Sequence, residues 1–191
     1  RFTCFCIEPM KESVQIIHEK IKNYQRIDAK VLDIGISRNG GKIDFFKGNA
    51  STLFTSSPEH MKRFPENFKT VEKRTIQCCT VAEVLNRINY NRKSFDIIKV
   101  DVEGKDLEVI NSLLDSGIRK SSLVFELPST IEEACEAVKT LTNNGWSEFV
   151  LFARTGIYTN YIGDFSYEIL KRLESEEKLN SGNIIAFPCN K

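Results

Sequence analysis

The segment Phe95–Val102 (FDIIKVDV) limits what this chain can fold into more than any other part of it. Its apolar residues are nearly continuous, which is typical of a strand that is buried on both faces of a parallel sheet. Gly104 ends this pattern, and Lys105–Ser116 then carries apolar residues at helical spacing. A buried strand followed by an amphipathic helix predicts one repeat unit of an α/β domain.

The same alternation recurs along the 191 residues, which are enough for one domain. We predict further strands at Arg1–Ile7, Lys30–Ile36, Ile43–Phe46, Val71–Cys79, Ser122–Leu127, Phe149–Ala153 and Asn183–Phe187. We predict further helices at Met10–Tyr24, Val81–Ile88, Ile131–Asn143 and Tyr167–Leu179, and a long surface loop at Gly48–Thr70. This order predicts a single α/β domain with a mainly parallel sheet.

A glycine-containing segment near the second strand allows two interpretations. Val31–Gly35 (VLDIG), followed by Gly40 and Gly41, is similar to a loop that holds a phosphate at the start of a helix. Here the next residues, Lys42–Phe46 (KIDFF), are typical of a strand rather than a helix. We therefore predict a strand and a hairpin turn over Asp33–Gly41, with the phosphate loop as the alternative.

Composition excludes several classes of protein. The 27 Lys and Arg residues nearly balance the 26 Asp and Glu residues, which argues against a nucleic-acid-binding protein. No apolar run approaches the roughly 18–20 residues of a membrane span. The six cysteines form no CxxC pair, and there are only two histidines, so we expect neither a zinc site nor disulfides. We expect reduced, mostly buried cysteines in a cytoplasmic protein.

Acidic residues stand where the predicted parallel strands end, and ligands bind at that edge of an α/β sheet. Glu8 ends the first strand, where a carboxylate can accept both hydroxyls of a ribose. The alternative is an acid that stabilises the start of the following helix.

Lys99, Asp101 and Glu103 alternate along the extended chain and should share one side of it. Charges inside such an apolar strand destabilise the fold unless they are paired or functional. The alternative is a buried Lys99–Asp101 pair with no further role. Glu126 ends the next strand and could join the same cluster as a substrate-binding group, or else face solvent.

Four segments in order resemble the FkbM family of S-adenosylmethionine-dependent methyltransferases: Cys6–Pro9 (CIEP), Ile98–Gly104 (IKVDVEG), Val124–Leu127 (VFEL) and Asn183–Pro188 (NIIAFP). The resemblance implies a Rossmann-like class I methyltransferase fold, with a mostly parallel sheet, a C-terminal antiparallel strand and three α/β/α layers. It also implies methyl transfer to oxygen, often on sugars or polyketide-type metabolites.

The resemblance implies roles for several residues. Glu8 would bind the cofactor ribose, and Ser37 would lie near its adenine. Asp101 and Glu103 would lie beside the methyl group and the acceptor.

Ser51 and Thr52, with the following leucine, resemble a small polar patch of the family that faces the substrate. The family's first strand and glycine loop, which hold the methionine end of the cofactor, would precede Arg1. Without that central strand, we expect a gap in the sheet beside its ligand edge.

Together these features predict an O-methyltransferase that uses S-adenosylmethionine on a small metabolite, sugar or glycan. An alcohol is a weak nucleophile, so the enzyme must align its oxygen with the methyl group and assist proton loss. Asp101 is the first choice for base or orienting group, and Glu103 the second. A divalent metal held by Asp101, Glu103 and Glu126 is an alternative that we do not favour. Two other functions stay open: a non-catalytic binding module and a nicotinamide-dependent oxidoreductase.

Overall fold

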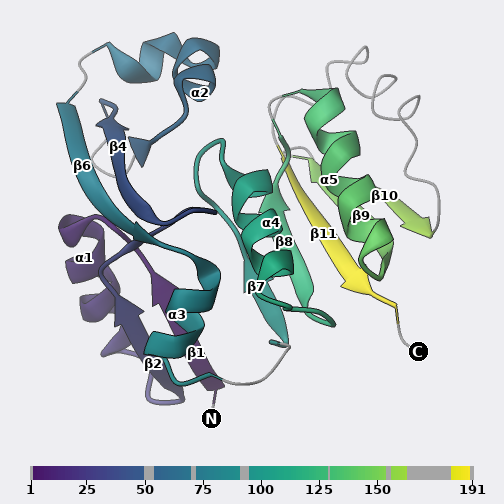
Figure 1. The fold of residues 1–191 in the computed structure, drawn as a ribbon, viewed down its shortest axis with the longest axis horizontal. Coiled ribbons are helices and arrows are strands. Elements are labelled where there is room, and N and C mark those ends of the chain that lie inside the picture. Colours follow the sequence, from purple (N-terminus) through teal and green to yellow (C-terminus); the bar gives the residue numbers. More distant parts are fainter. Residues whose placement is uncertain are drawn as a thin grey trace.

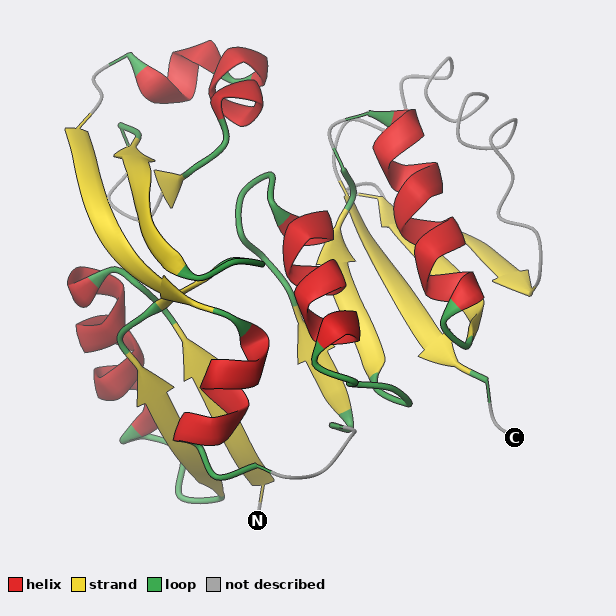
Figure 2. Ribbon diagram, viewed as in Figure 1, coloured by secondary structure: helices red, strands yellow, loops and turns green. Residues whose placement is uncertain are grey.

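A computed structural model describes residues 2–49, 54–69, 72–90, 95–128, 130–153, 156–162 and 182–189 of the chain. Within these ranges the strands and helices form three sheets with helices packed beside them (Figures 1 and 2). The prediction of an α/β fold is confirmed. No described helix is both long and apolar enough to cross a membrane.

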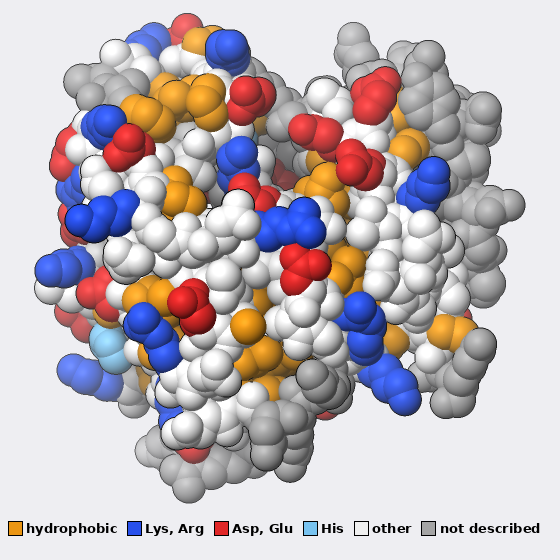
Figure 3. All heavy atoms as spheres, in the orientation of Figure 1, with side chains coloured by type: hydrophobic (Ala, Val, Ile, Leu, Met, Phe, Trp, Pro, Cys, Tyr) orange, Lys and Arg blue, Asp and Glu red, His pale blue; other side chains and the backbone are white. Residues whose placement is uncertain are grey.

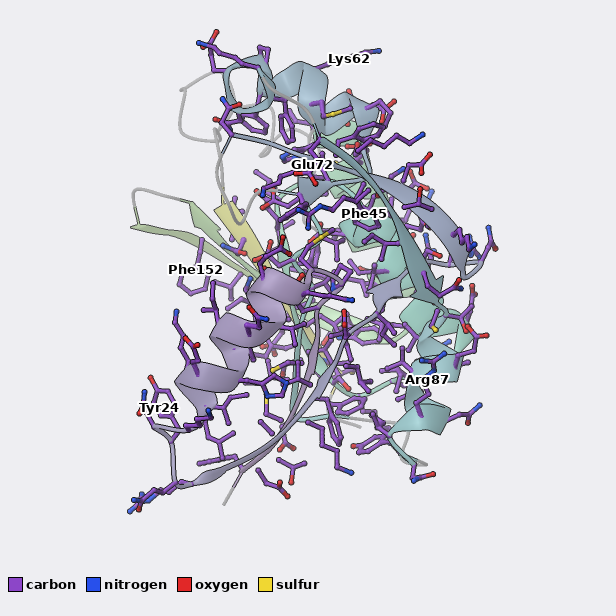
Figure 4. The ribbon with its side chains drawn as sticks, turned by 90° about the vertical axis from the view of Figure 1, so that its left-hand side faces the viewer. Tyr24, Phe45, Lys62, Glu72, Arg87 and Phe152 are labelled. Carbon is purple, nitrogen blue, oxygen red and sulfur yellow. The ribbon has the colours of Figure 1, made fainter. Side chains whose placement is uncertain are left out.

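The first sheet has two parallel strands, β1 (Phe2–Ile7) and β2 (Ile27–Leu32), joined by helix α1 (Lys11–Ile21). Phe2 lies opposite Ile27 and Ile7 opposite Leu32. No residue of these three elements is buried, because the two strands offer the helix only a narrow surface. Figure 4 looks onto this side of the molecule and shows Tyr24, which is 60% exposed, at the periphery beyond the end of α1.

The second sheet has the strand order β3-β6-β4-β5, with bounds β3 Gly35–Ile36, β6 Glu72–Cys79, β4 Gly41–Lys47 and β5 Phe54–Thr55. A strand does follow the glycines, as predicted, so the phosphate-loop alternative fails. The predicted hairpin is nevertheless wrong, because β3 and β4 lie on opposite edges of β6 and do not pair with each other.

The loop predicted at Gly48–Thr70 is wrong where the structure describes it. Besides β5, it contains helix α2 (Pro58–Arg63) and the 3₁₀ helix η1 (Pro65–Phe68). Ser57 starts α2 by accepting a hydrogen bond from the His60 N–H at 3.2 Å, and Pro58 fits the first turn. These elements are too short to produce a periodic hydrophobic pattern, which is why the sequence looked like a loop.

The third sheet has the order β10-β9-β11-β8-β7 and carries most of the core. Its strands are β7 (Ile97–Lys99), β8 (Ser122–Glu126), β9 (Trp146–Ala153), β10 (Gly156–Ile162) and β11 (Gly182–Pro188). The accompanying helices are α3 (Val81–Arg87), α4 (Asp106–Asp115) and α5 (Ile131–Asn143). Helices α4 and α5 cover the same face of this sheet in Figure 1. Thr80 and Thr130 cap α3 and α5 by accepting hydrogen bonds from the backbone N–H groups of Glu83 and Glu133.

The prediction of a mainly parallel sheet is wrong. Three of the described strand pairs are parallel (β1–β2, β3–β6 and β7–β8), and five are antiparallel. The expected C-terminal antiparallel strand is present as β11, which runs against both β8 and β9. Strand β10 was not predicted, and the helix predicted at Tyr167–Leu179 lies outside the described residues.

The strand predicted at Phe95–Val102 is shorter and more exposed than expected. Regular pairing covers only β7, and Ile97 is 67% exposed whereas Val100 is 3% exposed. Among the described residues, β7 pairs only with β8 and β1 only with β2. In the described part of the chain, the first and third sheets therefore stay separate between β1 and β7. Ile97 and Lys99, which lie on the same face of β7, are both exposed, so no described element covers that face.

All six cysteines are free, as expected, but only Cys78 and Cys79 are buried. Cys4 is exposed and the other three are intermediate, so the prediction of mostly buried cysteines is wrong. The reason for Cys4 is its position on β1, where little covers the strand.

Candidate functional site

A cavity of about 280 Å³ lies where β1 and β7 end, and we call it the strand-end cavity. It is lined from the first sheet by Ile7–Met10, from the segment leading into β3 by Ile34–Ile36, and from the loop after β7 by Asp101–Glu103. The cavity thus joins the carboxyl ends of strands from two different sheets. It brings together Glu8, Asp101 and Glu103, three of the residues that the sequence analysis selected.

Glu8 is held in place by backbone and side-chain hydrogen bonds. Its N–H donates to the Leu32 carbonyl at 3.0 Å, and its Oε1 accepts from the Met10 N–H at 2.8 Å. Burial raises the pKa of Glu8, the Met10 bond opposes that shift, and the charge of Asp33 adds to it. The bond to Met10 is the helix-start contact of the alternative interpretation. Among the described residues Oε2 has no partner, so one oxygen stays free to accept a hydrogen bond in the cavity.

Asp101 also lines the strand-end cavity, and its Oδ2 contacts the Lys99 ammonium. The two side chains are 52% and 56% exposed, so the buried Lys99–Asp101 pair of the alternative interpretation is wrong. They are exposed because the face of β7 that carries Lys99 lacks cover. An exposed ion pair contributes about 0–1 kcal/mol, so Asp101 is not needed to neutralise a buried charge.

Glu103 is fixed by two contacts with the β5–α2 region. Its backbone carbonyl accepts from the Thr55 hydroxyl at 2.6 Å, and its Oε2 lies 3.2 Å from His60 Nε2. Glu103 has φ 51° and Gly104 has φ 93°, so the chain turns through two left-handed residues here. Thr55 is fully buried, which makes the attachment of this turn rigid.

His60 is a site residue that the sequence analysis missed. Its side chain is 6% exposed and packs against the rings of Phe64 and Phe68, with centroids 4.9 and 6.2 Å away. The sequence signal for a helix start is Ser57-Pro-Glu-His60, in which a cap residue precedes a proline. It lies inside the segment predicted to be a loop. A helix predicted to begin after Ser57 would have placed His60 in the first turn of α2.

A second cavity, of about 290 Å³, lies beside the first at the starts of α4 and α5, and we call it the helix-start cavity. It is lined by His60, by Gly104–Glu108 and by Glu126–Pro128, together with Arg38, Phe64, Asn111 and Glu133. In the space-filling view, a hollow separates the α2 side from the α5 side of the molecule, and acidic side chains lie around it (Figure 3).

Two carboxyl groups of this second cavity have raised pKa values. Burial raises the pKa of Asp106 to about 6, although its Oδ1 accepts the Glu126 N–H at 3.1 Å. Burial also raises the pKa of Glu126, and the charges of Glu103, Asp106 and Asp101 add to the effect. The charges of Asp101 and Glu103 act on Glu126, but Glu126 lines the helix-start cavity and not the strand-end cavity, so its role as a substrate-binding group stays a prediction. Asp106 was not predicted, because it reads as an ordinary first-turn acid of α4.

One predicted residue that the structure describes, Ser37, lines neither cavity. Ser37 is buried, but its hydroxyl donates to the Gly40 carbonyl at 3.2 Å, and its neighbour Ile36 lines the strand-end cavity instead. Its position near an adenine stays a prediction. Ser51 and Thr52 lie outside the described residues. Within the described ranges, no group of three or more His, Cys, Asp or Glu side chains is arranged to hold a metal ion.

A family model, described as the methyltransferase FkbM domain, matches residues 3–152 of the chain. The matched range includes every residue that lines the two cavities. Comparison with curated proteins gave no match, and neither did comparison with solved structures.

Proposed function

The chain belongs to the FkbM methyltransferase family, and on that basis we propose that it moves a methyl group from S-adenosylmethionine to a hydroxyl of a small metabolite, sugar or glycan. S-adenosylmethionine would supply a methyl group bound to a positively charged sulfur. The observation that carries the proposal is the strand-end cavity, which is lined by three acidic residues where β1 and β7 end. We propose the cytoplasm as its compartment, because six free thiols suit a reducing environment.

The residues of the strand-end cavity suit such a ligand. Glu8 has a free, half-buried carboxylate oxygen, and a carboxylate at a strand end can bind ribose hydroxyls. Asp101 and Glu103 add negative charge on the opposite wall, where a cationic sulfur would be stabilised. We propose that Glu8 binds the ribose, and that Asp101 orients the acceptor hydroxyl toward the methyl group.

Glu8 also allows a direct test by isothermal titration with S-adenosylhomocysteine. Glu8→Ala should weaken binding by ~1–3 kcal/mol, the usual contribution of charge-assisted hydrogen bonds. Glu8→Gln keeps an oxygen for the Met10 N–H, and should still weaken binding because the charge is lost. Glu19→Ala removes an exposed acid of α1 that does not line the cavity, and should bind as tightly as the parent.

The same titration separates the alternatives. If the parent protein binds neither S-adenosylmethionine nor S-adenosylhomocysteine, the methyltransferase proposal fails and a non-catalytic module remains. Binding of NAD in place of both would indicate the oxidoreductase. If the parent binds and both Glu8 variants bind equally well, Glu8 serves only the start of α1.

A further inference from the structure

One ion pair connects the two cavities. Glu103 lines the strand-end cavity, and its carboxylate lies 3.2 Å from Nε2 of His60, which lines the helix-start cavity. Lys105 lines both. The Glu103–His60 pair therefore lies at the junction of a cavity suited to the methyl donor and an adjoining cavity to which no ligand has been assigned.

The imidazole is held in one orientation. The rings of Phe64 and Phe68 pack against it, and Glu103 faces its Nε2. On the other side lies Gly104, which also lines the helix-start cavity. A Cβ at position 104 would come within 3.3 Å of His60 Nδ1, so the glycine leaves space beside that nitrogen which any other residue would fill.

The charges of the helix-start cavity restrict what it can bind. Its acids are Asp106, Glu108, Glu126 and Glu133, and its cations are Arg38 and Lys105. Both cations are already engaged with acids: Arg38 Nε with Asp115 at 2.9 Å and Lys105 Nζ with Glu108 at 4.0 Å.

Glu126, in contrast, has no partner for its carboxylate among the described residues. Such a lining repels phosphates and carboxylates, and can accept hydrogen bonds from hydroxyls.

We propose that the helix-start cavity binds the methyl acceptor as an uncharged polyhydroxylated molecule, such as a sugar without phosphate, that its reactive hydroxyl reaches the junction with the strand-end cavity, and that His60 is the base that removes the hydroxyl proton. This inference rests on the proposed function. In the step, the hydroxyl oxygen forms a bond to the methyl carbon while the carbon–sulfur bond breaks and its electron pair stays on sulfur. The hydroxyl proton passes to His60 Nδ1, and Glu103 stabilises the resulting imidazolium at Nε2.

Binding can be tested without turnover. Saturation-transfer NMR, with S-adenosylhomocysteine present, compares a panel of neutral methyl glycosides with the matching sugar phosphates. We expect signals from neutral glycosides only. Asn111→Trp fills the helix-start cavity and should abolish them, whereas Asn86→Trp, at an exposed position of α3 outside both cavities, should keep them. Both variants should bind S-adenosylhomocysteine within about twofold of the parent, since neither residue lines the strand-end cavity.

Each other outcome has a distinct meaning. A parent protein that fails to bind S-adenosylhomocysteine overturns the proposed function itself. If it binds S-adenosylhomocysteine but no neutral glycoside, or if sugar phosphates bind as well, this inference alone fails. Glycoside signals that persist in Asn111→Trp also contradict it.

The role of His60 is tested with the glycoside that binds. His60→Gln should lower kcat by ~10²–10⁴-fold with little change in KM. Retained binding of S-adenosylhomocysteine shows that the variant is folded. Glu103→Gln, which keeps the shape of the pair, is the second variant and should lower kcat less than His60→Gln does. A folded His60→Gln protein with the parent's kcat overturns the assignment.

Discussion

Two regions of this molecule share one construction and differ in how they are buried. In β1–α1–β2 and again in β7–α4–β8, a helix connects two parallel strands. Helix α1 has no buried residue, whereas α4 has six, including Ile110 and Leu113. The strand β8 pairs on its other edge with β11, whereas β2 has no second neighbouring strand among the described residues. The comparison shows that a βαβ unit is stabilised by the sheet beyond it, since its own strands and helix give too little apolar contact.

The proposed cofactor site depends on both regions. Glu8 comes from the weakly buried unit, whereas Asp101 and Glu103 follow the first strand of the well-buried one. Any local opening of β1–α1–β2 would therefore move Glu8 away from Asp101 and Glu103 in the strand-end cavity. Regions with few buried contacts open most readily.

The largest expected effect is a loss of stability when one isoleucine is truncated to alanine on α4, compared with the same change on α1. Ile110 of α4 is fully buried, so Ile110→Ala should lower the free energy of unfolding by about 2–5 kcal/mol. Ile17 of α1 is only partly buried, so Ile17→Ala should lower it by about 1 kcal/mol or less. Urea unfolding followed by circular dichroism measures both. Equal losses would mean that the two units are equally well packed.

A smaller effect, which sharpens the comparison, is the pH dependence that Asp106 gives to the well-buried unit. Burial raises the pKa of this carboxyl from 3.8 to about 6, so between those values the folded state holds a proton that the unfolded state releases. Its contribution to stability is complete below about pH 4 and is lost as the pH rises through 6, by up to about 3 kcal/mol.

Asp106→Asn keeps the oxygen that accepts the Glu126 N–H and removes the titration. Relative to the parent, this variant should therefore gain stability between pH 4 and pH 7. Urea unfolding at several pH values measures the gain. A difference between variant and parent that does not change over this range would contradict the assignment.

The smallest change in stability is expected at Asp101. Because its pair with Lys99 is half exposed, Asp101→Asn should lower stability by under about 1 kcal/mol. If Asp101 orients the acceptor, methyl transfer should nevertheless fall by ~10²–10⁴-fold. Thermal melting and turnover on one sample compare the two effects. A variant that melts much earlier and keeps its specific activity would show that Asp101 serves the fold instead.

Most of the helices and strands were predictable from local sequence. Thr130 and its capping box marked the start of α5, and the predicted bounds Ile131–Asn143 match the structure. Pairing was harder to predict, because it depends on which strands meet across the fold. The antiparallel pairs of β11 and the separate sheet of β1 and β2 leave no periodic signal in their own residues.

The site was partly predictable for a related reason. Glu8, Asp101, Glu103 and Glu126 stand out because a charge ends an apolar run. His60 and Asp106 do not stand out, since each looks like an ordinary polar residue near a helix start. Their importance comes from contacts with distant segments, His60 with Glu103 and Asp106 with the Glu126 backbone.

The turn at Gly104 has a consequence for how this protein can evolve. A Cβ there would lie 3.0 Å from the Cβ of His60, and the backbone has φ 93°, so both space and conformation require glycine. Every missense change in a glycine codon adds a Cβ, so every single substitution at position 104 is expected to destabilise this turn. A smaller side chain at position 60 would relieve the close contact but not the positive φ, so position 104 should stay glycine even in lineages in which position 60 changes.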